Sequence, residues 1–462
     1  MKNNRFKFIL AISLAGIFLI TSGQNCGGPS EDKGPSKLTP VNLTYWRVKE
    51  DSSSFSDLIS GFQQIYPHVS ITYKQLRPEV YEEELLNAWA RDKGPDLFSI
   101  PSTWLGKYQD MILPIPLGAE IQMKREVIVG TFKKAVRVET KIERIYNLME
   151  LKKAFVDIVP EEILIDGNIY GLPMAMDILA LYYNREMLNN AGIVHPPATW
   201  PEFIEDVRVL TFQDREGNFI QAGASLGGAE NTRYGVDILS LLMLQNETPM
   251  VEGGNAAFNR PAPSIPGEAP YFPGVAALEF YTDFANPLKE IYTWNEDMPD
   301  SLDAFTGARC AFFFGYSSDL ALIRALGPKL AFDITPVPQI SGSLKKVNFA
   351  NYWLETVSKK TAHPHEAWAF LNYISRAQNA KSFLDKVGYP TAHRDLISQQ
   401  LKNIELAPFT EGVLTAKTWY HGKNYTLVEE AFKEMIKDVL LGRKETIKEA
   451  VDWCVQKVNL TY

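Results

Sequence analysis

The segment from Leu164 to Trp200 restricts the possible folds of this chain more than any other stretch. Its center is an unbroken apolar run from Leu179 to Tyr183. A run that is apolar on both faces is typical of a strand buried between two layers. Gly167 and Gly171 permit tight turns before the run, and Pro173 fixes one backbone angle. The segment therefore predicts a buried strand that is entered through tight turns, as in an α/β protein.

The residues before this segment alternate between strand and helix patterns. The expected order is a strand at 41–46, a helix at 55–65, a strand at 69–73, a helix at 81–90 and a strand at 96–100. Such an order predicts a mostly parallel sheet with right-handed crossovers. Since 462 residues exceed what one hydrophobic core accommodates, we expect two lobes. Ligands of such sheets bind beyond the carboxyl ends of the strands, which places residues 46–51 and 102–104 at the mouth of a cleft.

Two further segments have their own patterns. Residues 121–160 mix basic and apolar residues with few turn signals, and we expect one or two helices that lengthen the first lobe. Residues 252–274 are rich in Gly, Pro and Ala, which predicts a long loop in the second lobe.

The N-terminus has the layout of a secretory signal. Three cations precede an apolar stretch at 8–20, which is short for a transmembrane span, and we expect residues 1–25 to be the signal peptide. Cys26 is similar to the attachment cysteine of bacterial lipoproteins, although residues 23–25 depart from the usual pattern. The alternative is an ordinary cleaved signal with an incidental cysteine. Residues 26–40 are rich in Gly, Pro, Ser and charge, which predicts a flexible tether.

Charge and cysteine content exclude some classes of protein. The net charge is −8, which argues against binding to the phosphates of nucleic acids. Besides Cys26, the chain has only Cys310 and Cys454, each in an apolar segment. They could form a disulfide or lie buried separately.

Several motifs together resemble family 1 extracellular solute-binding proteins, the maltose-binding-like receptors of ABC importers. The order of these loose motifs makes the resemblance specific, and it extends from about Val41 to Asn459. The motifs are Gly94-Pro95-Asp96, Asp166-Gly167, Tyr170-Gly171-Leu172-Pro173, the run 179–183 closing on Asn184, Ala191-Gly192-Ile193, Pro196 to Trp200, Phe305 to Ala311, Phe332 to Pro338, Ala367 to Leu371, and Gly388-Tyr389-Pro390 with Arg394.

The resemblance implies an α/β, two-lobed periplasmic-binding-protein-like (type II) fold. Each lobe would be a mostly parallel sheet flanked by helices, and a multi-strand hinge would join the lobes. Lobe 1 would comprise 41–176 and 353–396, lobe 2 would comprise 182–347 and 400–462, and the hinge would lie near 175–181, 347–353 and 396–400.

The resemblance also implies a function. The protein would be the extracytoplasmic substrate-binding component of an ABC importer, without enzymatic activity, cofactor or metal. It would be a monomer, held at the membrane by a lipid on Cys26, or periplasmic or secreted without that lipid. Its partners would be a small solute, most often a sugar or oligosaccharide in this family, and the permease subunits.

Side chains that suit a sugar follow the predicted strands. Carboxylates accept hydrogen bonds from sugar hydroxyls, and aromatic rings stack on the apolar sugar face. Asp177 is the first candidate, because an idle carboxylate in its apolar segment would be costly to bury. Its alternative role is a structural hydrogen bond across the hinge. The further polar candidates after strands are Glu50, Asp51, Ser102 and Thr103, with Trp104 beside them.

Aromatic residues and one Gly-rich turn complete the candidate site. Tyr316, Trp353, Tyr389 and Trp419 are the stacking candidates, and each could instead belong to the core. Relatives use the turn that corresponds to Gly227–Asn231 against the ligand. This implies contacts from Gly228 and Asn231, with a simple helix start as the alternative.

Two enzymatic alternatives are present in the sequence. Ser225 lies in a G-x-S-x-G pattern with histidines downstream, which would suit a secreted serine hydrolase. His363 and His365 could bind a metal, but no third ligand clusters with them and no H-E-x-x-H occurs. No G-x-x-x-x-G-K-[ST] occurs either, which excludes the ATPase of a transporter.

Overall fold

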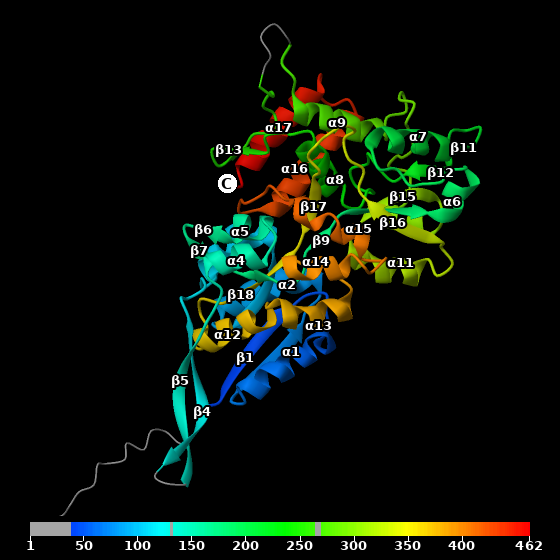
Figure 1. Ribbon diagram of the computed structural model, residues 1–462. Coiled ribbons are helices and arrows are strands. Elements are labelled where there is room, and N and C mark those ends of the chain that lie inside the picture. Colours follow the sequence, from blue (N-terminus) through cyan, green and yellow to red (C-terminus); the bar gives the residue numbers. More distant parts are fainter. Residues whose placement is uncertain (1–37, 130–132, 264–268) are drawn as a thin grey trace, which may run out of the picture.

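The computed structural model describes residues 38–129, 133–263 and 269–462, and two five-stranded sheets organise them (Figure 1). The first sheet has the order β2-β1-β3-β18-β8, and the second has the order β11-β12-β15-β10-β16. The strands of the first sheet are β1 (Val41–Arg47), β2 (Val69–Gln75), β3 (Leu97–Pro101), β8 (Leu172–Pro173) and β18 (Trp353–Val357). The strands of the second are β10 (Ala180–Asn184), β11 (Phe212–Gln213), β12 (Phe219–Ala224), β15 (Cys310–Gly315) and β16 (Phe332–Pro336).

The expected strand and helix order holds in the first sheet. β1 pairs in parallel with both β2 and β3, as the β-α-β-α-β pattern predicts. The last two ladders are antiparallel, because β18 returns from the far part of the chain between β3 and β8. The helices packed around this sheet are α1 (Ser52–Ile65), α2 (Pro78–Ala90), α12 (Pro364–Ile374) and α13 (Ala377–Val387).

The second sheet is mixed, which corrects the expectation of mostly parallel pairing there. Only β12 and β15 pair in parallel, and the other three ladders are antiparallel. The reason is that β10, which arrives from the first sheet, inserts between β15 and β16 and runs against both. Helices beside this sheet include α6 (Arg185–Asn190), α7 (Trp200–Leu210), α8 (Gly235–Gln245), α9 (Pro273–Asp283), α10 (Ser301–Thr306) and α11 (Leu320–Leu326).

A three-stranded sheet lies between the two larger ones (Figure 1). Its strands are β9 (Asp177–Ile178), β17 (Asn348–Asn351) and β19 (Ala416–Lys417). β9 pairs with β17 shortly before the chain enters β10, and β17 is followed directly by β18. The chain therefore passes twice between the large sheets through neighbouring strands. The lobe boundaries and hinge given above stay predictions.

The remaining helices connect the sheets and close the C-terminal part. The last two helices, α16 (Tyr425–Leu440) and α17 (Ile447–Asn459), pack on each other and on α9. The others are α3 (Leu105–Tyr108), α4 (Leu148–Ala154), α5 (Ile158–Ile163), α14 (Arg394–Gln400) and α15 (Ala407–Thr410), with the 3₁₀ turns η1 (Ser102–Trp104), η2 (Gln109–Met111), η3 (Ser317–Asp319) and η4 (Val413–Thr415).

The prediction of helices at 121–160 is wrong for its first half. β4 (Ala119–Val129) and β5 (Lys133–Glu143) form an antiparallel hairpin that projects from the body (Figure 1). Its basic and apolar residues, including several Val and Ile, recur at a period closer to two than to 3.6, which favours a strand. Helices appear only afterwards, as α4 and α5.

Two short hairpins and one loop remain to be described. β6 (Leu164–Ile165) and β7 (Asn168–Ile169) form a tight turn at Gly167, which has a positive φ of 79°. The stretch 252–274 begins as a short hairpin of β13 (Val251–Glu252) and β14 (Asn255–Ala256). As predicted, no further regular element follows in its described part until α9.

Buried side chains form two main cores. One surrounds the first sheet and reaches the flank of the second, and the other lies under α7, α8, α16 and α17. Cys310 and Cys454 are buried in different places and are not joined.

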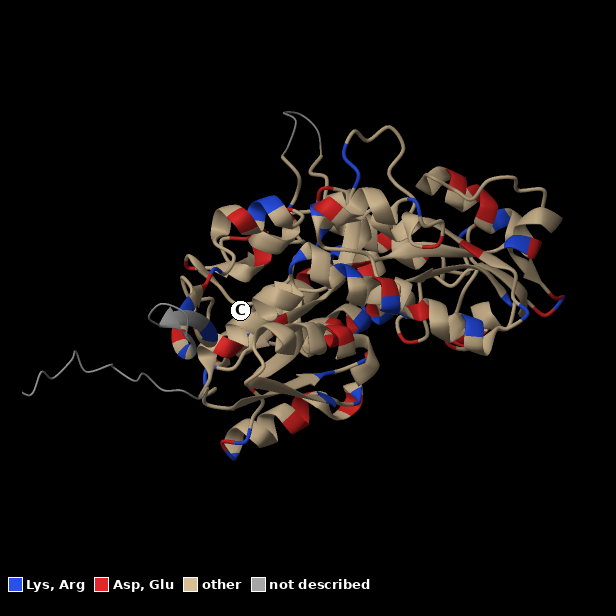
Figure 2. Ribbon diagram, turned by 60° about the horizontal axis from the view of Figure 1, so that its bottom comes forward, with Lys and Arg blue, Asp and Glu red and all other residues tan. Residues whose placement is uncertain are grey.

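No helix within the described ranges is both long enough and apolar enough to cross a membrane. Basic and acidic residues intermingle over the elements seen in Figure 2, without a continuous basic stripe in that view. Cys26, the signal peptide and most of the predicted tether fall outside the described residues.

Candidate functional site

Two adjoining chambers lie between the large sheets, and both are lined by Lys49, Tyr234, Asn351 and Trp353. Their volumes are about 580 and 1010 Å³, including space open to solvent. The first chamber is further lined by Arg47, Glu50, Met174, Ala175, Asp177, Tyr316, Ser318, Tyr352, Glu355, Phe383 and Tyr389. The second is further lined by Pro101, Ser102, Thr103, Trp104, Asp237, Phe349, Ala350, Thr418, Trp419, Tyr420, Tyr425 and Glu429.

The ends of strands bring most of these residues together. Lys49 and Glu50 follow β1, η1 follows β3, and Tyr316 follows β15. Ser102, Thr103 and Trp104 of η1 border the second chamber. The chambers therefore occupy the position expected for a ligand of α/β sheets, beyond the strand ends.

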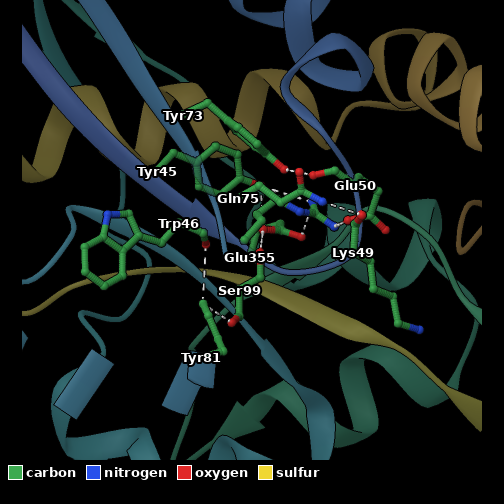
Figure 3. A network of polar contacts seen from close by, with 10 residues as sticks. Tyr45, Trp46, Lys49, Glu50, Tyr73, Gln75, Tyr81, Ser99 and Glu355 are labelled. Carbon is green, nitrogen blue, oxygen red and sulfur yellow. Dashed lines mark hydrogen bonds and ion pairs between the residues drawn. The ribbon is translucent and has the colours of Figure 1, made fainter. Parts of the chain in front are cut away.

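A network of charged groups forms the floor of the first chamber (Figure 3). The guanidinium of Arg47 binds Glu355 at 2.7 Å and Glu50 at 2.9 Å. Glu355 also accepts hydrogen bonds from the hydroxyls of Tyr45, at 2.5 Å, and Ser99. Arg47 is only 5% exposed, so these contacts are needed to offset the removal of its charge from water.

Glu50 is thus held as predicted near the cleft, but one of its carboxylate oxygens is engaged by Arg47. Its backbone carbonyl accepts a hydrogen bond of 2.6 Å from Tyr73. Lys49, next in the chain, extends its side chain away from the network (Figure 3). Lys49 also has a positive φ of 47°, a conformation that favours glycine. The turn therefore directs a lysine into both chambers at some cost in backbone strain.

Asp177 borders the first chamber and also takes the structural role considered as its alternative. Its two carboxylate oxygens accept hydrogen bonds from the backbone N–H groups of Ser317, at 2.8 Å, and Ser318, at 3.0 Å. Burial raises the pKa of Asp177, while these hydrogen bonds and the charge of Lys49 oppose the rise. Asp177 therefore fixes β9 to η3 and also forms part of the wall of the first chamber.

All four aromatic candidates line the chambers. Trp353 and Tyr389 are partly exposed, whereas Tyr316 and Trp419 are buried. The hydroxyl of Tyr316 donates to Asp237 at 2.7 Å, and the indole of Trp419 donates to Ser240 at 3.0 Å. Tyr316 and Trp419 thus combine a place in the wall with a place in the core.

The structure does not bring Asp51, Gly228 or Asn231 to either chamber. Asp51 caps α1, which begins at Ser52 and so three residues before the expected helix at 55–65, and it accepts hydrogen bonds from the backbone of Ser53 and Ser54. The amide of Asn231 donates to two backbone carbonyls, at 2.7 and 2.9 Å, and accepts from the indole of Trp294. Its hydrogen-bonding capacity is used inside the protein, as the helix-start alternative implies.

The sequence placed Lys49 in the range at the mouth of the cleft without choosing it as a candidate, and it gave no indication of the lining residues Tyr234, Asp237, Asn351 and Glu429. Lys49 could have been chosen as well, because it directly precedes the two acids that were chosen for their place after β1. Tyr234 has a positive φ of 60°, which no sequence pattern indicates. Asp237 and Glu429 lie on helices α8 and α16, whose patterns give no reason to expect them at a cleft.

The geometry does not support the serine hydrolase alternative. Ser225 is buried, and its hydroxyl donates to the backbone carbonyl of Phe312 at 3.4 Å. No histidine among the described residues hydrogen-bonds to it. His393 lies in the other core against Phe155, and burial lowers its pKa to about 4.

The two histidines that could have suggested a metal have structural positions. His363 is the residue before α12, and the Nδ1 of His365 accepts a hydrogen bond from the backbone of Glu120. Within the part of the chain that the structure describes, no three His, Cys, Asp or Glu side chains are grouped to hold a metal ion.

Comparison with solved structures places this architecture in a known class. A binding protein for cyclic α-maltosyl-1,6-maltose from Arthrobacter globiformis aligns with a TM-score of 0.70 at 18% identity, over 91% of this chain and 99% of that one. The sugar-binding protein MalE of Xanthomonas citri aligns with a TM-score of 0.69 at 18% identity, over 91% and 97%. The fold is therefore the two-sheet α/β fold of periplasmic binding proteins, with mixed sheets flanked by helices.

The family model described as "Bacterial extracellular solute-binding protein" matches residues 46–381, and the chain belongs to this family. It is a family of binding proteins, which agrees with the expectation that the chain is not an enzyme. Maltodextrin-binding protein MdxE of Bacillus subtilis is 25% identical over 66% of this chain and 71% of its own length. A putative binding protein of Brucella abortus is 24% identical over 38% of this chain, and the match spans 36% of that protein.

Proposed function

We propose that this protein is the extracytoplasmic substrate-binding component of an ABC importer and that it captures a sugar or oligosaccharide. The observation that carries the proposal is the pair of chambers between the sheets, which offers carboxylates, a lysine and several aromatic rings at strand ends. Carboxylates suit sugar hydroxyls and rings suit the apolar sugar face. Family membership and the names of relatives such as the maltodextrin-binding protein support the same ligand class.

The mechanism follows from the arrangement of the two sheets. A ligand that first contacts one wall gains the contacts of the other only when the walls approach. Its differential affinity then shifts the population to a closed form. β9, β17 and the segments that follow them connect the walls, and Asp177 ties β9 to η3 at this place. We expect the closed form to dock on permease subunits in the membrane, with the protein as a monomer.

A thermal-shift screen tests the proposal. The protein without its N-terminal 37 residues is heated with mono- and oligosaccharides, polyols and amino acids. A ligand at about 100 times its Kd adds roughly 2.7 kcal/mol of stability, which is readily measured. A saturable shift with one class of saccharide is the expected result. A folded protein that responds only to amino acids, or to no compound of a broad panel, would contradict the proposal.

The lipid anchor forms a separate part of the proposal. The signal-like N-terminus and Cys26 support attachment of the mature protein to the cell membrane. We expect the wild-type protein in the membrane fraction and the Cys26→Ser variant in the soluble fraction. Equal distribution of the two proteins would leave an ordinary secretory signal as the explanation.

A further inference from the structure

The second chamber contains two carboxylates that the protein leaves without a cationic partner. Asp237 lies in the first turn of α8, and Glu429 lies one turn after Tyr425 on α16. Asp237 accepts hydrogen bonds from Tyr316, at 2.7 Å, and Tyr425, at 3.4 Å. Neither carboxylate forms an ion pair with any of the described residues.

The cations near this chamber act elsewhere. Lys49 lines the chamber, but the carboxylates on which its charge acts are Asp177 and Asp319, where it opposes the rise in pKa that burial causes, and not Asp237 or Glu429. Lys433 acts on Glu429 from a distance and forms its ion pair with Glu230, at 3.6 Å. The first chamber differs in this respect, because Arg47 lies between Glu50 and Glu355 there.

The electrostatics of the pair indicate an unmet need for positive charge. Burial raises the pKa of Asp237 to about 6, since its two hydroxyl partners offset only part of the lost hydration. Partial loss of water, followed by the negative charge of Asp237, raises the pKa of Glu429 to about 7, although Glu429 is an exposed residue at the rim of the chamber. A cation in the chamber would relieve both effects.

Aromatic rings surround the same space. Tyr425, Tyr420 and Trp419 approach from the C-terminal side, with ring centroids 5.5 Å apart for the two tyrosines and 5.7 Å apart for Trp419 and Tyr420. Trp104 and Trp353 line the opposite wall, which belongs to the first sheet. Rings beside carboxylates are the surroundings that bind ammonium groups, through cation–π attraction together with charged hydrogen bonds.

We propose that the ligand of this protein is an amino sugar or amino-sugar oligosaccharide whose protonated amine lies between Asp237 and Glu429. The inference rests on the proposed function and names its ligand class. The sugar rings would stack on the tryptophans of the second chamber, and the ammonium group would supply the positive charge that these carboxylates lack.

Matched ligands that differ in charge provide the test. Binding to the purified protein is measured by calorimetry with glucosamine oligomers of two to four units, with their N-acetylated counterparts and with neutral glucose oligomers. N-acetylation removes the positive charge and keeps the sugar backbone. We expect glucosamine oligomers to bind at least about tenfold more tightly, the effect of roughly one charged hydrogen bond.

Two variants locate the effect. Glu429→Gln and Asp237→Asn should each weaken binding of glucosamine oligomers by about ten- to a hundredfold and change binding of the neutral oligomers little. Glu430→Gln is the matched control, because it removes the same charge from the next position of α16, which is exposed like Glu429 but is not part of the chamber wall. It should leave all affinities within about twofold.

The outcomes separate the two proposals. Binding of neutral oligosaccharides without preference for the amine, or equal losses for all ligands in Glu429→Gln, would overturn the amino-sugar inference and leave the sugar-binding function intact. A failure of every saccharide, charged or neutral, to bind would overturn the proposed function and the inference with it.

Discussion

The two chambers of the cleft differ in how their charged side chains are paired. In the first, Arg47 is held between Glu50 and Glu355 and is also 4.6 Å from the ring of Phe55, so its charge is satisfied within the protein. In the second, Asp237 accepts hydrogen bonds from the hydroxyls of Tyr316 and Tyr425, and neither it nor Glu429 forms an ion pair with a described residue. A paired buried charge maintains the shape of a site, whereas an unpaired one costs stability and remains available to a ligand.

Breaking the ion-pair network of the first chamber should produce the largest change in the free energy of unfolding. Arg47→Met removes one member of the network and leaves Glu355 buried without its cation. We expect the free energy of unfolding to fall by about 3–5 kcal/mol, measured by urea denaturation at pH 7. A loss below about 1 kcal/mol would show that the network contributes little to the fold.

Removing a charge from the second chamber should raise the free energy of unfolding, in contrast to the loss expected for Arg47→Met. The folded state binds the proton of Asp237 more tightly than the unfolded state, because its pKa is about 6 instead of 3.8. The unfolding free energy therefore falls as the pH rises from about 4 to above 6. At pH 7.5 Asp237→Asn should be more stable than the wild type by about 2–3 kcal/mol, and the difference should disappear toward pH 4.

Denaturation at several pH values measures this effect. Asp206→Asn is not a suitable control, since the pKa of Asp206 is raised as well. Asp438→Asn is the better control. Like Asp237, Asp438 is buried on a helix, but it has cationic partners, Lys444 at 3.7 Å and Arg443 at 3.8 Å. A variant Asp237→Asn that is less stable than the wild type at pH 7.5 would contradict the comparison between the chambers.

Asp177 lies between these two extremes, since it holds η3 and borders the first chamber. We expect Asp177→Ala to weaken ligand binding by about 1–3 kcal/mol, the cost of losing a charged hydrogen-bond partner. Calorimetry with the saccharide found in the thermal-shift screen measures this change. Unchanged affinity would limit Asp177 to its structural role.

Asp51 provides the smallest effect and a control for Asp177. It caps α1 outside both chambers, so Asp51→Ala should lower the free energy of unfolding by about 1 kcal/mol through loss of the cap. Ligand affinity should remain that of the wild type. A clear loss of affinity in this variant would place Asp51 in the binding site, as its position after β1 had suggested.

The sequence alone determined the elements whose information is local. The apolar run at 179–183 is buried except for the half-buried Tyr183 and enters β10, and the strands expected near 41–46, 69–73 and 96–100 appear as β1, β2 and β3. These features depend on hydrogen bonds and burial patterns within a few residues. The strands β4 and β5 were missed because the many basic and acidic residues among their apolar ones obscure the period of two.

Only the tertiary structure decided which side chains meet in the cleft. Asp177 meets the backbone of Ser317 and Ser318, Arg47 meets Glu355, and Glu429 joins the same chamber as Asp237. These partners are far apart along the chain, and no short pattern links them. The packing of two sheets through neighbouring crossing strands brings them together, and it determines whether a carboxylate such as Glu355 pairs with an arginine or, like Asp237, lines a chamber without a cationic partner among the described residues.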